Sequence, residues 1–73
     1  MEMIYKAVIE GGGTSWSAFV PDIPGCVAAA SSRKRVEELI RGAVEVHIEV
    51  LREIGEPVPL PTTTDGTIDV TAA

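Results

Sequence analysis

Apolar and polar residues alternate along the chain with two different periods, which divide it into short strands and one long helix. Residues 3–10 and 15–20 are rich in strand formers and alternate with period two, and small apolar residues fill 26–30. Between residues 33 and 54 the apolar positions recur every three or four residues, as in an amphipathic helix. Residues 67–71 alternate again. This pattern predicts an α+β fold in the order β-β-β-α-β, a small antiparallel sheet with one long helix packed on one face.

The segment from Ser32 to Gly55 contains the predicted helix. Ser32 is a suitable N-cap, and Gly55 followed by Pro57 is typical of a helix end. Lys34 and Arg35 lie in the first turn, where the helix dipole favours acidic side chains. The apolar face that we expect to pack on the sheet consists of Val36, Leu39, Ile40, Ala43, Val44, His47, Val50, Leu51 and Ile54.

Glycine and proline residues separate the predicted strands. Gly11 to Gly13 interrupts the first strand and favours a hairpin connection, because a phosphate-binding glycine loop needs a helix directly after it. Pro21 to Gly25 predicts a rigid turn, since proline restricts φ and glycine accepts a positive φ. The proline-rich residues 56–61 predict an extended connector, although such segments also serve as ligands for aromatic grooves.

Length and composition favour a small domain that associates with another chain. The 73 residues form one domain at most, and one cysteine excludes an intrachain disulfide. Because a core this small usually needs a further source of stability, we expect a homodimer or a higher homo-oligomer. A net charge of −5 argues against direct nucleic-acid binding by this chain. Since no apolar run is long enough to span a membrane, we expect a soluble cytoplasmic protein.

One helix can cover one face of a small sheet, so the other face is expected to meet solvent. The alternation in the first two strands places Tyr5 and Ala7 toward the helix and leaves Ile4, Val8 and Phe19 on the opposite face. The outer strands would also present unpaired edges. Exposed apolar surface and free edges are usually buried against another chain. The pattern therefore predicts a binding module.

The reactive side chains form no recognisable catalytic pattern. His47 lies on the apolar helix face and is interpreted as a half-buried structural or interface histidine, because the sequence identifies no orienting group. Cys26 is interpreted as a small residue packed against the helix. We predict no enzyme, no catalytic residue, no metal and no cofactor. The carboxylates outside the helix lack metal-binding spacing and are interpreted as solvated surface acids: Glu10, Asp22, Asp65 and Asp69.

The turn Pro-Asp-Ile-Pro-Gly-Cys at residues 21–26, with the strand before it, resembles the signature of the HicB antitoxin family. The helix and the exit Gly-Glu-Pro-Val-Pro at 55–59 are similar to that family's N-terminal domain, so the resemblance covers residues 3–61. It implies a partial RNase H-like fold without the nuclease residues. It also implies the antitoxin of a type II toxin–antitoxin pair, whose partner is HicA, a small basic ribonuclease.

The chain departs from the family pattern in two places. Many members continue into a C-terminal helix-turn-helix or ribbon-helix-helix that binds promoter DNA, whereas this sequence ends at Ala73. We therefore expect a single domain over 1–73 without a C-terminal DNA-binding domain, and DNA autoregulation stays an open question. Acids usual in the first helical turn are replaced by Lys34 and Arg35.

These observations predict an antitoxin that binds and occludes a HicA-like mRNA-cleaving ribonuclease. Two alternatives stay open. An RNase H-like nuclease would cleave RNA with magnesium and would depend on Glu10 or Asp22. An orphan adaptor would bind some other small protein through its sheet edge. The residues proposed to contact the partner lie at or beside the central turn and are Trp16, Phe19, Asp22, Ile23 and Pro24.

Overall fold

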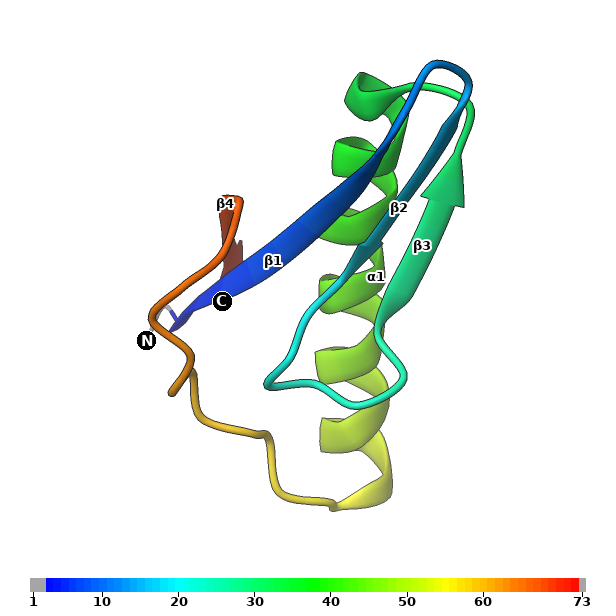
Figure 1. Cartoon of the computed structure of the whole chain (residues 1–73). Helices are drawn as coiled ribbons and strands as arrows, with labels where there is room; N and C mark the ends of the chain where they lie inside the picture. Colours follow the sequence, from blue (N-terminus) through cyan, green and yellow to red (C-terminus); the bar gives the residue numbers. More distant parts are fainter. Residues whose placement is uncertain (1–2, 73) are drawn as a thin grey trace.

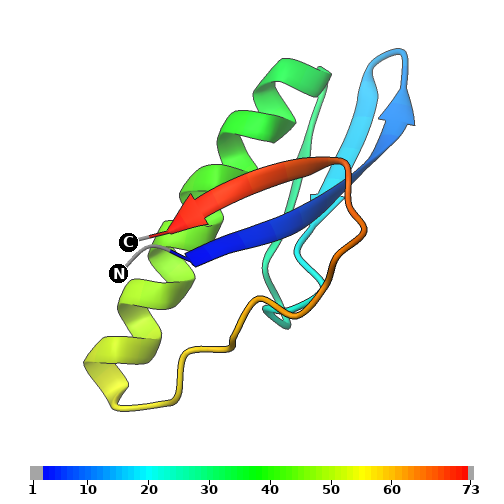
Figure 2. The ribbon, with the colours of Figure 1, turned by 90° about the vertical axis from the view of Figure 1, so that its left-hand side faces the viewer.

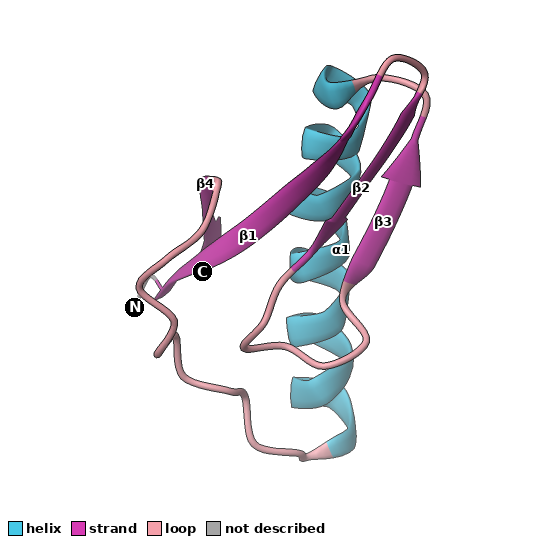
Figure 3. Cartoon of the chain, viewed as in Figure 1, coloured by secondary structure: helices cyan, strands magenta, loops and turns pink. Residues whose placement is uncertain are grey.

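A computed structural model describes residues 3–72 as four strands and one helix. The strands form one antiparallel sheet in the order β3-β2-β1-β4, and the helix crosses a single face of it (Figures 1 and 3). The predicted α+β fold in the order β-β-β-α-β is confirmed. Within the described residues, no helix combines the length and apolar character that a membrane crossing requires. The elements are β1 (Met3–Gly12), β2 (Ser15–Phe19), β3 (Val27–Ala30), α1 (Arg33–Ile54) and β4 (Ile68–Ala72).

The long central strand β1 has a different partner on each half. Its residues 8–12 pair with β2, and its residues 3–7 pair with β4. Figure 2 shows β4 running beside β1 after the connector has crossed from the end of α1. β3 pairs with β2 and ends the sheet on the other side. The sheet therefore has two edges, β3 and β4, at opposite ends of the strand order.

The first hairpin differs from the one that the sequence predicts. β1 does not stop before the glycines but continues through Gly11 and Gly12, and the turn begins at Gly13, whose φ is +56°. Gly11 pairs with Trp16, and a Cβ on Gly11 would lie only 2.7 Å from the Trp16 Cα. Glycine is required here because the two backbones approach too closely for a side chain, which also explains a glycine inside a strand.

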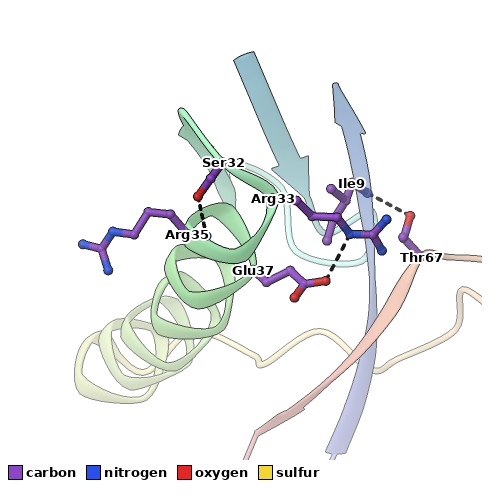
Figure 4. A network of polar contacts seen from close by, with 6 residues as sticks. All are labelled: Ile9, Ser32, Arg33, Arg35, Glu37 and Thr67. Atoms are coloured by element: carbon purple, nitrogen blue, oxygen red, sulfur yellow. Dashed lines mark hydrogen bonds and ion pairs between the residues drawn. The ribbon is translucent and has the colours of Figure 1, made fainter. Parts of the chain in front are cut away.

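Both predicted helix caps are confirmed. The Ser32 hydroxyl accepts a hydrogen bond from the backbone N–H of Arg35 at 3.1 Å (Figure 4). At the other end Gly55 adopts a left-handed conformation with φ +77°, and its N–H donates to the Arg52 carbonyl. Each cap satisfies a backbone group that the helix itself leaves unpaired.

The sheet buries a narrower arc of α1 than the predicted apolar face, with Ile48 added to it. The buried residues of α1 are Val36, Ile40, Val44 and Ile48. Ile48, which lies outside the predicted apolar face, is 3% exposed, whereas Val50 and Ile54 are 46% and 64% exposed. The predicted face is confirmed at Val36, Ile40 and Val44 and is wrong at Val50 and Ile54. Apolar residues cover more than one arc of this helix, so periodicity alone does not select the arc that packs. The other buried apolar side chains are Tyr5, Ala7, Ala18, Val20, Ile23, Cys26, Val70 and Ala72.

Candidate protein-interaction surfaces

The turn between β2 and β3 is held by its own backbone. The Val20 N–H donates to the Cys26 carbonyl, the Ile23 N–H to the Val20 carbonyl and the Cys26 N–H to the Ile23 carbonyl, each at 3.1 Å. Gly25 has a φ of +83°, which non-glycine residues adopt only with strain. The predicted turn is confirmed, and these bonds give it one defined shape.

Asp22 ties this turn to the connector, which we define as residues 56–67. Its carboxylate accepts four hydrogen bonds from the backbone N–H groups and hydroxyls of Thr62 and Thr63, at 2.8–2.9 Å. These bonds, above all the one from the Thr63 N–H, hold the pKa of Asp22 below its ordinary value, against a smaller opposing effect of desolvation. Asp22 therefore supports the turn by linking it to the connector, and its interpretation as a solvated surface acid is wrong. We call Asp22, Thr62 and Thr63 the Asp22 cluster.

The five residues predicted to contact a partner do not form one surface. Ile23 is 1% exposed, so the expectation that it is accessible is wrong. The reason is that the backbone bonds of the turn direct its side chain into the core. Trp16 is half-buried against that core, and its indole N–H donates to the Gly13 carbonyl at 3.0 Å. Phe19 and Pro24 are exposed.

The sheet face away from α1 carries an apolar row. Val8, Phe19 and Val27 stand side by side across three strands, according to the pairing of Val8 with Phe19 and of Phe19 with Val27. Val27 is 65% exposed, Ile4 and Phe19 are also exposed, and Val8 is half-buried. The predicted exposure of Ile4 and Phe19 is confirmed. We call Ile4, Val8, Phe19 and Val27 the outer-face row.

A second exposed apolar surface lies on the flank where α1 meets the edge strand β3. It encloses a hollow of about 510 Å³, which we call the flank groove. Val46 is 58% exposed there, and Gly42 lies beside it. Neither residue was assigned to a surface from the sequence. An apolar residue and a glycine that fall outside the sheet-facing positions of a helix are nevertheless visible in the sequence and could have indicated an exposed apolar surface. The groove is lined by Val27, Ala28, Ala29, Leu39, Gly42, Ala43, Val46 and His47.

The geometry of residues 3–72 reveals no catalytic group formed by the reactive side chains. His47 is half-buried, as predicted, with Nδ1 3.2 Å from the Ala43 carbonyl oxygen. Cys26 is buried, and this burial raises the pKa of its thiol. The Asp69 carboxylate pairs with the Lys6 ammonium group. Among residues 3–72, no three His, Cys, Asp or Glu side chains are grouped so that they could hold a metal ion.

Comparison with known proteins identifies relatives of this fold. The N-terminal domain of the Burkholderia pseudomallei antitoxin HicB is 24% identical and superposes with a TM-score of 0.72, over 100% of this chain and 96% of that chain. A chain in the HicA3 and HicB3 toxin–antitoxin complex is 23% identical, with a TM-score of 0.66 over 96% and 93%. No curated protein sequence matches the chain. A family model described as a HicB-like antitoxin of bacterial toxin–antitoxin systems matches residues 5–71.

Proposed function

Because this chain belongs to the family of HicB-like antitoxins of bacterial toxin–antitoxin systems, we propose that it neutralises a HicA-like, mRNA-cleaving ribonuclease by binding it and covering its active site. The family match across residues 5–71 carries this proposal, since it extends from β1 into β4. A solved complex of a similar protein holds HicA3 with HicB3, which supports a toxin of that kind as the partner. The protein then works in the cytoplasm as a type II antitoxin, by occlusion and without chemistry of its own.

The outer-face row is the surface that we assign to the toxin. It offers apolar area for a stable contact, and Phe19 provides an aromatic anchor of the kind that dominates interface energies. Pro24 and Trp16 remain proposed contacts at the margin, whereas Asp22 and Ile23 would act indirectly by holding the turn. The net charge of −5 speeds encounter with a basic toxin, an effect that salt weakens. We also propose that the sheet and helix form a partial RNase H-like fold and that the active form of the protein is a homodimer.

A titration of toxin activity tests the proposal. Purified chain is added to an RNA-cleavage assay with a HicA-like toxin encoded beside it, and cleavage should stop at a defined molar ratio. Phe19→Ala should raise the concentration needed for half inhibition by about 10-fold or more. Leu60→Ala is the matched control, because Leu60 is an exposed apolar residue on the connector, and it should inhibit like the wild type. Full cleavage at concentrations well above micromolar would overturn the antitoxin role.

The same preparation tests the two alternatives. Magnesium-dependent RNA cleavage by the chain alone, lost in Glu10→Gln or Asp22→Asn, would favour a nuclease. A complex with a protein unlike HicA, formed through the sheet edge and without effect on RNA cleavage, would favour an adaptor. Neither outcome is expected if the protein only occludes a toxin.

A further inference from the structure

The sheet face away from α1 carries few charged side chains. Tyr5 is buried under the helix, so strand alternation directs the even-numbered positions 4–10 of β1 to the opposite face. The strand register assigns their partners on β2, β3 and β4 to the same face. Most of these strand positions hold neutral residues. The charged side chains among them are Lys6, Glu10 and Asp69.

Glu10 is the charge of this face that its own chain leaves uncompensated. The Lys6 ammonium group pairs with the Asp69 carboxylate on the adjacent strand, so these two charges cancel. None of the ion pairs found among residues 3–72 includes Glu10. Its cross-strand partner, Ser17, is uncharged. Lys6 lies four residues away along β1, about 13 Å, which is too far for a second ion pair.

The Glu10 carboxylate borders the outer-face row. Val8 lies two positions before Glu10 on the same face, about 7 Å away. Ser17, the partner of Glu10, lies two positions before Phe19 on β2. A protein that covers the row therefore reaches the exposed Glu10 side chain as well. Because a carboxylate is costly to cover without a partner, the surface that fits here is apolar with a Lys or Arg beside it.

An enzyme that cleaves RNA has to supply cations of this kind. RNA carries a negative charge on each phosphate, and proteins hold phosphates largely with Lys and Arg side chains. Cations and other donors also stabilise the charge that develops when a phosphate bond is cleaved. If a purely apolar surface covered such a site, these cations would be left desolvated and unpaired, which is strongly unfavourable. A covering protein therefore needs an anion at the right place.

We propose that the Glu10 carboxylate takes the place of an RNA phosphate and pairs with a phosphate-binding Lys or Arg of the toxin. The outer-face row covers the apolar surface beside that cation. The inference rests on the proposed function and adds to it the residue that recognises the active site by charge. Lys6 and Asp69 do not compete for this role, because each already neutralises the other.

Inhibition of toxin cleavage by charge variants tests the role of Glu10. Glu10→Gln keeps the size of the side chain and should raise the concentration for half inhibition by about 10-fold or more. Glu10→Lys should raise it by about 100-fold or more, because it places like charges together. Glu56→Gln is the matched control: it makes the same change at an exposed acid of the connector and should inhibit like the wild type. Circular dichroism should be unchanged in all three variants, because both acids are exposed.

Inorganic phosphate provides a readout that a structural role of Glu10 would not affect. Binding of the chain to the toxin is measured by calorimetry in chloride and in phosphate at equal ionic strength, so that general screening is the same. Phosphate should weaken binding of the wild type, because it competes with the Glu10 carboxylate for one cation. Binding of Glu10→Gln should be nearly the same in both salts, since that variant has no carboxylate to displace.

Three results would overturn the inference while leaving the antitoxin role intact. If Glu10→Gln inhibits like the wild type, Glu10 is only a solvated charge that opposes aggregation of the sheet. If Glu10→Gln and Glu56→Gln are weakened equally, net charge and not a contact is responsible. If phosphate affects the wild type and Glu10→Gln alike, Glu10 does not occupy a phosphate site. A wild-type chain that fails to inhibit overturns the proposed function and this inference together.

Discussion

Val44 and Val46 provide a matched test of which arc of α1 packs on the sheet. Val44 is 0% exposed and Val46 is 58% exposed, although they lie two residues apart on one helix. Val44→Ala removes two buried methyl groups, worth about 1.6 kcal/mol of transfer free energy, and leaves a cavity that raises the loss to about 2–3 kcal/mol. The better helix propensity of alanine returns about 0.5 kcal/mol. The expected loss in the free energy of unfolding is therefore about 2 kcal/mol.

The same substitution at Val46 should be nearly neutral in the monomer. Its methyl groups are mostly in water, so the lost transfer free energy of about 0.7 kcal/mol is largely offset by the gain of about 0.5 kcal/mol in helix propensity. A loss of 2 kcal/mol is easy to measure, since a chain of this length has a stability of roughly 4 to 11 kcal/mol. The contrast between Val44 and Val46 is thus a sensitive measure of burial.

Urea unfolding followed by far-ultraviolet circular dichroism measures both variants against the wild type. The measurement is made at protein concentrations where sedimentation shows a monomer. Val44→Ala should lower the urea midpoint clearly, whereas Val46→Ala should unfold close to the wild-type midpoint. Equal losses for the two variants in the monomer would refute the packing described for α1.

Three further predictions concern the turn and its connector. Because hydrogen bonds lower the pKa of Asp22, its stabilising contribution is complete above an ordinary aspartate pKa near 4 and is lost as the pH falls through the lower folded-state pKa. Asp22→Asn should flatten the acid limb of a stability–pH curve measured with urea, and an unchanged limb would contradict the Asp22 cluster. Tyr5→Phe should cost about 1–2 kcal/mol in urea unfolding, because the buried hydroxyl donates to the Pro59 carbonyl; a neutral effect would argue against that bond. The Cys26 thiol should react slowly with an aromatic disulfide reagent until urea unfolds the chain, since burial raises its pKa, and rapid native labelling would show that the site is open.

Local features of the structure could be predicted from the sequence because they depend on neighbouring residues. Ser32 and Gly55 cap the helix through atoms three or four positions away, and both caps were predicted. The turn from Pro21 to Gly25 follows from restricted φ angles at proline and a positive φ at glycine. The inward direction of Tyr5 follows from strand alternation. In the candidate site, the exposure of Phe19 was predicted for the same reason.

The tertiary structure decided the features that depend on which distant segments meet. Asp22 bonds to threonines about 40 residues later in the chain, so its role in holding the turn is set by the path of the connector. Ile23 is buried because the turn folds back over the core, and Val46 is exposed because the sheet covers one of two apolar arcs. Periodicity states that an arc is apolar, but the number and position of packed layers determine whether that arc meets the sheet, the solvent or another chain.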